Sequence, residues 1–272
     1  MLAEFEIGTR KVWATFLRDA RLMMSYRVAF FLGWFAIVAS VVGLWFVSKL
    51  VPESAVFGNG RMATYFNYAV VNVAFVTLQS TALLCFENSI RNEQVYGTFE
   101  AVLATPTSVS LVVLAASAWA FTFALIQVAL YLSVAMLLGL DLHHVNLASL
   151  AIFLILSITA TVPIGIIGAA VVVRFKQTAP TQSIFGRAST VLAGVLFPVS
   201  LLPFWLQGVS WMLPLTHALA GIRGAFDGLS LQALSSDAIW LSAATLVLLP
   251  CSLYAFRAAV VRAKADGTLG QY

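Results

Sequence analysis

The stretch VAFFLGWFAIVASVVGLWFV, residues 28–47, contains no charged side chain. A helix needs about 20 apolar residues to cross the hydrocarbon core of a bilayer. The rest of the chain is similarly apolar: 61% of its 272 residues are hydrophobic and only 10% are charged, whereas soluble domains average about 45–50% and about 25%. The sequence therefore predicts an all-α protein that crosses the membrane several times.

Six segments are apolar enough to be spans, and each should be a helix because backbone groups in lipid must hydrogen-bond internally. They are residues 28–47, 64–86, 110–139, 147–173 (interrupted by Pro163), 188–198 and 238–260. The first span follows a polar stretch of 27 residues, which argues against a cleavable signal peptide. We expect a transmembrane domain at 28–260 and a cytoplasmic tail at 261–272.

The basic residues predict the orientation. If the N-terminus is cytoplasmic, twelve of the fifteen Lys and Arg residues lie inside, and only Lys49, Arg61 and Arg223 lie outside. This distribution obeys the positive-inside rule. We therefore expect both termini in the cytoplasm.

Residues 1–27 place apolar side chains such as Val12, Phe16 and Met23 near helical spacing, with basic residues on the other sides. An amphipathic helix in the cytoplasmic interface, facing anionic lipid headgroups, explains this pattern. A plain juxtamembrane anchor that only sets the topology explains it equally well.

Residues 197–223, FPVSLLPFWLQGVSWMLPLTHALAGIR, are apolar but contain Pro198, Pro203 and Pro214. Proline inside a helix removes a backbone hydrogen bond, so one straight span is not expected. We predict two short re-entrant helices at the outer face, packed against protein or a cavity. His217 in this unit is expected to make a structural hydrogen bond.

No catalytic or nucleotide-binding pattern is present: GxxxxGK[ST], HExxH and GxSxG are all missing. Asp141, His143 and His144 predict an exposed polar turn, and the two cysteines predict membrane-core positions without a disulfide or a metal. We expect this chain to bind no cofactor, metal or nucleic acid. The spans lack the buried charges that proton- or ion-coupled transporters use.

One face of the second span is polar but uncharged. Its members, spaced by three or four residues, are Tyr65, Tyr68, Asn72, Phe75 and Gln79. The face could line a substrate path or form hydrogen bonds between helices. In the fifth span Ser189, Thr190 and Gly194 favour close helix packing, and Thr190 is a further candidate for the path.

The loop FENSIRNEQVYGTFEAVLATP, residues 86–106, gathers Glu87, Arg91, Glu93 and Glu100. Glu87 and Arg91 are spaced to continue the helix, Gly97 interrupts it, and Thr98 can cap a second short helix. The pattern predicts a bent, acidic cytoplasmic elbow at 87–105 that docks another protein; a solvated loop is the alternative.

That loop, the FLRDARLMMSYR stretch before the first span and the later LFPVSLLP…LPLTHALAGIR resemble the membrane subunit of an ATP-binding cassette exporter of the type-2 permease family. The resemblance implies that ATPase subunits hold ATP and Mg, and that a second permease chain, identical or different, completes the pore. The first, second and fifth helices would border the path.

The resemblance also assigns roles to residues and a location to the protein. ATPase coupling would involve Glu93, Gln94, Tyr96, Gly97, Thr98 and Glu100, and the outer gate Phe197, Pro198, Pro203 and Pro214. The protein would reside in the plasma (inner) membrane of a prokaryote, with lipid around it, and export a drug-like, lipid-like or glycan substrate.

Three alternative functions make different demands on the sequence. An ATP-independent six-span channel or carrier suits the polar stripe of the second span. A membrane enzyme acting on lipid-linked substrates needs acidic or histidine residues that converge, and none do so. A scaffold has no need of the proline-broken outer segment.

Overall fold

The computed structural model describes residues 2–52, 57, 62, 64–95, 109–175 and 185–265, and every regular element in these ranges is a helix. The elements are α1 (Leu2–Ser25), α2 (Arg27–Leu50), α3 (Tyr65–Val95), α5 (Val109–Leu137), α6 (Leu147–Phe175), α7 (Arg187–Leu192), η3 (Val199–Leu201), α8 (Phe204–Trp211), α9 (Pro214–Phe226) and α10 (Ser235–Ala265). The all-α prediction is confirmed for these residues.

Five helices are long and apolar enough to cross a membrane within the described ranges. The spans are Phe30–Leu50 in α2, Tyr65–Arg91 in α3, Ser117–Leu137 in α5, Leu147–Phe175 in α6 and Ser235–Ala263 in α10. The chain is therefore a multi-pass integral membrane protein.

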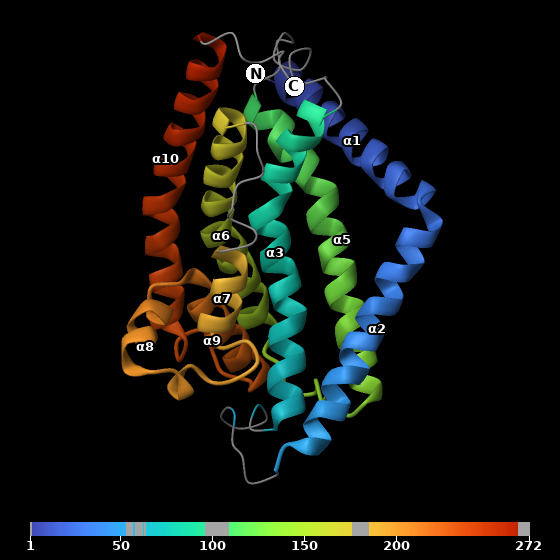
Figure 1. Cartoon of the computed structure of the whole chain (residues 1–272), viewed down its shortest axis with the longest axis vertical. Coiled ribbons are helices and arrows are strands. Elements are labelled where there is room, and N and C mark those ends of the chain that lie inside the picture. The colour runs from blue at the N-terminus through green and yellow to red at the C-terminus, as the bar shows by residue number, and fades with distance from the viewer. Residues whose placement is uncertain are drawn as a thin grey trace.

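The fifth predicted span, residues 188–198, is not a continuous helix. Helix α7 is six residues long and ends at Leu192. Gly194 then adopts a φ of +71°, which glycine reaches without the steric cost that other residues meet. Helix α6 ends at one end of the bundle and α8 lies toward the other (Figure 1), so the chain returns across the bundle between Phe175 and Phe204.

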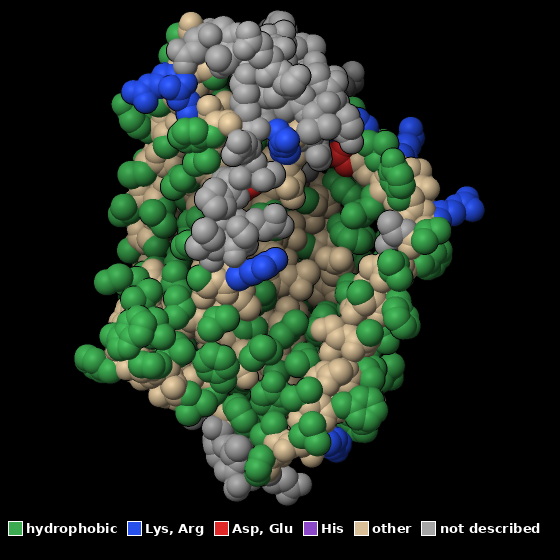
Figure 2. All heavy atoms as spheres, viewed as in Figure 1, with side chains coloured by type: hydrophobic (Ala, Val, Ile, Leu, Met, Phe, Trp, Pro, Cys, Tyr) green, Lys and Arg blue, Asp and Glu red, His purple; other side chains and the backbone are tan. Residues whose placement is uncertain are grey.

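Helix α3 is the centre of the bundle (Figure 1). It packs against α5, α6, α2 and α9. Of an apolar 18-residue stretch of α3, 67% is buried inside the chain, compared with 6% of the corresponding stretch of α2. Helix α2 instead presents Phe31, Phe35 and Phe46 on the outside. Apolar side chains cover much of the surface shown in Figure 2, as expected for a protein surrounded by lipid.

Helix α1 runs obliquely and meets α2 at Tyr26 (Figure 1). The ring of Phe16 lies 5.3 Å from that of Trp119 on α5 in an edge-on arrangement, and it stacks on Trp13 at 5.4 Å. Aromatic contacts thus attach α1 to the bundle. Its position in a lipid interface stays a prediction.

Local sequence explains where several helices begin. The Asn146 side chain accepts a hydrogen bond from the backbone N–H of Ser149 at 3.1 Å, which caps the start of α6. Pro198 precedes η3, Pro203 precedes α8, and Pro214 is the first residue of α9, the position where the missing N–H has no helical partner to lose. Pro163 lies inside α6, which nevertheless continues to Phe175.

Candidate functional site

A buried polar cluster joins α3 to α9. Its centre is Arg223 of α9, whose Nη1 donates to the Tyr68 hydroxyl at 3.4 Å and to Asn72 Oδ1 at 3.3 Å. The guanidinium also lies over the Tyr68 ring, 5.1 Å from its centroid, in cation–π geometry. We call Arg223, Tyr68 and Asn72 the arginine cluster.

The arginine cluster also holds the turn that follows α7. The Tyr68 hydroxyl donates to the Gly194 carbonyl at 2.5 Å, and Asn72 Nδ2 donates to the Val195 carbonyl at 3.0 Å. Tyr68 and Asn72 are buried. Three parts of the chain that are far apart in sequence are therefore fastened at one place.

Nearby carboxylates partly compensate the lost hydration of Arg223, which is half-buried. Burial lowers the pKa of Arg223, and the negative charges of Asp237 and Asp227 oppose that change. Asp227 in turn accepts a hydrogen bond from the Met62 N–H at 3.3 Å. Because arginine keeps its proton in proteins, the cluster carries a permanent positive charge.

His217 connects α9 to the start of α10. Its Nδ1 lies 2.6 Å from Asp237 Oδ1 and its Nε2 lies 2.9 Å from the Trp211 carbonyl, and its ring stacks on Trp240 at 4.3 Å. Both nitrogens face acceptors, and only the protonated ring donates from both. The prediction of a structural hydrogen bond for His217 is confirmed.

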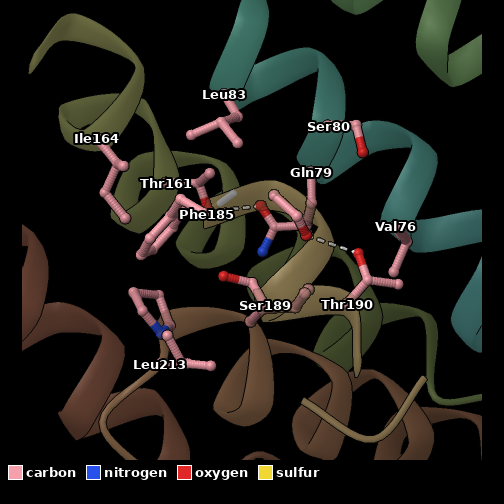
Figure 3. A pocket seen from close by; sticks show the side chains of 13 residues that line it. Val76, Gln79, Ser80, Leu83, Thr161, Ile164, Phe185, Ser189, Thr190 and Leu213 are labelled. Carbon is pink, nitrogen blue, oxygen red and sulfur yellow. Dashed lines mark hydrogen bonds between the residues drawn. The ribbon is translucent and has the colours of Figure 1, made fainter. Parts of the chain in front are cut away.

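The predicted path residues occupy different surroundings. Tyr65 is half-buried beside Phe57, with ring centroids 4.9 Å apart, and Phe75 packs against Phe226 at 5.8 Å. Tyr68 and Asn72 make the interhelical bonds described above. Of this stripe, Gln79 lines a small cavity together with Thr190 (Figure 3). Their part in a substrate path stays a prediction.

The predicted outer-gate residues flank η3, α8 and α9. Phe197 and Pro198 are half-buried, Pro203 is exposed and Pro214 is buried. Phe204 and Trp205 of α8 are strongly exposed, so α8 is an apolar helix on the surface of the chain. A gating role for this segment stays a prediction.

The predicted coupling residues are mostly beyond the structural description. Glu93 and Gln94 belong to the last turn of α3, whereas Tyr96, Gly97, Thr98 and Glu100 lie outside the described residues. Glu87, at the start of the predicted elbow, is 1% exposed. It follows Cys85 and Phe86, which belong to an apolar cluster of α3, α6 and α10.

The described residues contain no group of three His, Cys, Asp or Glu side chains placed to hold a metal ion. His143 donates its backbone N–H to Asp141 at 2.9 Å in an exposed turn. Cys85 is buried, Cys251 is exposed, and neither forms a disulfide.

The sequence did not reveal the partners within these clusters. The sequence pattern marks Arg223 only as a basic residue on the outer side, and it does not distinguish Asp237 as a partner. A weak signal for Arg223 was present, since it is a lone cation in an apolar, proline-started helix. Its partners on α3 are more than 150 positions away, which no local pattern encodes.

Comparison with known proteins identifies the family. The sequence model of the ABC-2 type transporter family matches residues 3–226. No curated protein matches the chain. The matched range contains the polar stripe of α3, the proline-broken segment and all of α9. The chain thus belongs to the ABC-2 type transporter family, and it is a membrane permease component of an ABC-type transporter rather than a catalytic subunit.

Proposed function

We propose that the chain is the permease of an ABC exporter and moves a drug-like, lipid-like or glycan substrate out of the cytoplasm. A separate ATPase subunit hydrolyses ATP with Mg. The family match over residues 3–226 carries the proposal, and the absence of a phosphate-loop motif in the sequence supports a separate source of energy.

The proposed orientation has both termini in the cytoplasm of a prokaryotic cell. Arg174 ends α6, and Arg257 and Arg262 lie near the end of α10, which share one end of the bundle with the start of α1 (Figure 1). Lys49 ends α2 toward the other end. This bias supports the positive-inside assignment, which makes the α8–α9 end the outer one.

A second permease chain, identical or different, completes the pathway in this proposal. Val41 is the one fully buried residue of α2 among those whose side chains the structure describes. Together with α3 and α7, α2 would border the path. The exposed side chains of α2 could contact lipid on one side of the helix and a partner chain on the other.

The arginine cluster would act as an outer latch, meaning a set of contacts that keeps the outer end of the path closed. It fastens the Gly194–Val195 turn to α3 through two hydrogen bonds from Tyr68 and Asn72. To open outward, the protein must separate α7 from α3 or move the two helices together. ATP can drive this change only if the contacts differ between the outward-closed and the outward-open state. We assign the cluster to the outward-closed state.

Coupling to ATP hydrolysis would occur through the elbow at 87–105. Closure of two ATPase subunits would push on this segment, and α3, a continuous helix of 31 residues, would carry the displacement toward the arginine cluster. Glu93, Gln94, Tyr96, Gly97, Thr98 and Glu100 are the proposed contact residues.

Transport into inside-out membrane vesicles tests the export direction. Vesicles that contain the chain and its ATPase should accumulate members of a panel of amphipathic fluorescent probes when ATP is added, and not with a non-hydrolysable ATP analogue. Equal accumulation with and without ATP would favour the ATP-independent channel or carrier instead.

A further inference from the structure

A small cavity lies between α3, α6, α7 and the start of α9 (Figure 3). Its volume is about 40 Å³, enough for a group of a few heavy atoms. Its polar lining comes from Gln79, Ser80, Thr161, Ser189 and Thr190, and the remainder is mainly apolar. Ser80 is exposed, so the cavity reaches the surface of the chain.

Two buried polar atoms face this cavity without a hydrogen-bond partner among the described residues. They are Gln79 Nε2 and Ser189 Oγ, on side chains that are each 6% exposed. In Figure 3 the amide nitrogen of Gln79 points toward the side of the cavity where Ser189 lies. A buried polar group is costly to leave unpaired, so this pair marks a place prepared for a hydrogen-bonding group.

The neighbouring hydroxyls are already engaged. Thr190 donates to the Gly186 carbonyl at 2.8 Å. The Thr161 hydroxyl lies 2.5 Å from Gln79 Oε1 and 2.9 Å from the Ser157 carbonyl, and its single proton serves one of these acceptors at a time. Neither Thr190 nor Thr161 forms a hydrogen bond with the Ser189 hydroxyl.

The chemistry is the same for both orientations of the Gln79 amide. As placed, the amide offers N–H to the cavity. Turned end for end, it would donate to Thr161, leave the Thr161 proton to Ser157, and offer its oxygen instead. Ser189 can donate or accept in either case, so a group that both donates and accepts is satisfied by the pair.

The lining also excludes charge. Among the residues that the structure describes, none that lines this cavity is acidic, basic or histidine. Val76, Leu83 and Phe185 form part of its apolar wall. A charged group placed here would lose its hydration without a counterion.

We propose that this cavity is a recognition subsite for a neutral hydroxyl or amide group carried on an apolar body. The group bonds to Gln79 and Ser189 while the apolar remainder lies along the α3–α7 surface. As a statement about the transported molecule, this rests on the proposed export function. It narrows the substrate to an uncharged amphiphile at this position.

Photolabelling of the full chain in nanodiscs tests the subsite. The probes are octanol bearing a diazirine and the matching octane that lacks the hydroxyl, with adducts mapped by mass spectrometry to residues 76–83, 161–164 and 185–190. We expect the alcohol to label these peptides more strongly. Ser189→Ala and Gln79→Leu should each lower its labelling about fivefold, the contribution of one hydrogen bond, without changing the labelling by the octane.

Matched controls are Ser133→Ala, on an exposed side chain of α5, and Gln127→Leu, half-buried on the same helix; both should label like wild type. Ser189→Ala removes an unpaired hydroxyl and should fold normally. Equal labelling by the two probes, or labelling unchanged in both cavity variants, would overturn the proposal and leave a cavity for water or lipid tails.

A vesicle assay separates this proposal from the proposed function. With NBD-aminohexanol and its methyl ether as probes, we expect the alcohol to be accumulated with the lower KM, and both cavity variants to remove that difference. ATP-driven accumulation with an unchanged KM in both variants would overturn the substrate assignment alone. Accumulation that does not depend on ATP in wild type would overturn the proposed function, and with it the assignment to a transported molecule.

Discussion

At the scale of single residues, the most constrained side chains lie where α9 meets α3 and α10. His217 has an acceptor at each ring nitrogen. Arg223 donates to Tyr68 and Asn72 and interacts electrostatically with Asp227 and Asp237. These residues make bonds between elements rather than within them. Their replacement should therefore loosen the α9 end without unfolding the individual helices.

Stability of the α9 end should depend on pH through His217. Burial lowers the pKa of His217, but the bonds to Asp237 and Trp211 and the charge of Asp237 raise it above its ordinary value overall. The stabilisation is therefore fully present below the unfolded pKa of about 6.5 and is lost as the pH rises through the raised folded pKa.

Thermal unfolding in detergent at pH 6 and pH 9 measures this effect. The difference in Tm between the two pH values should be about 3 °C smaller in His217→Gln than in wild type. His144→Gln, on an exposed turn, should keep the wild-type difference. An identical pH difference in His217→Gln would contradict the assignment of a protonated His217.

Removing the Tyr68 hydroxyl should weaken the latch. Tyr68→Phe deletes the bond to the Gly194 carbonyl and one acceptor of Arg223, which should cost about 1–2 kcal/mol of unfolding free energy. Tyr254→Phe, on an exposed position of α10, is the control. Denaturant unfolding in mixed micelles measures both, and equal stabilities would argue against the latch.

At the scale of elements, α9 is held on α6 by close approach. A Cβ at Gly221 would lie 2.0 Å from the ring of Phe153, which is fully buried. Gly221→Ala should thus lower stability by about 1–3 kcal/mol despite the better helix propensity of alanine.

Gly208 of α8 gives the matched control, because nothing lies within 4 Å of its added Cβ. Gly208→Ala should be neutral or stabilising, by up to about 1 kcal/mol. The two variants are compared by the temperature at which the detergent-solubilised protein aggregates. A Gly221→Ala protein as stable as Gly208→Ala would show that α9 does not pack on α6 in this way.

Element starts were predictable where the local chemistry is strong. Three prolines precede or begin η3, α8 and α9, and apolar length identified the helices α2, α3, α5, α6 and α10. Apolar composition alone failed for residues 188–198, because Gly194 turns the chain after a short helix. It also gave no sign that the partners of Asn72 are a distant carbonyl and an arginine.

At the scale of the whole molecule, α2 exposes much of its surface within one chain, and the sequence contains no phosphate-loop motif. In the proposed function, a separate ABC ATPase subunit supplies the energy for transport. Reversing charge at the proposed elbow, with Glu93→Lys and Glu100→Lys together, should reduce ATP-driven probe accumulation about tenfold or more while the chain still inserts. Asp141→Lys, in a turn at the other end of the bundle, should leave accumulation unchanged.

Affinity purification of the tagged chain from host membranes in mild detergent tests the central claim most directly. We predict that an ABC ATPase co-purifies in stoichiometric amount, that the complex hydrolyses ATP in a vanadate-sensitive manner, and that Gly97→Pro weakens this association. Purification of the chain without any ATPase, from membranes in which it still moves the probes, would contradict the account.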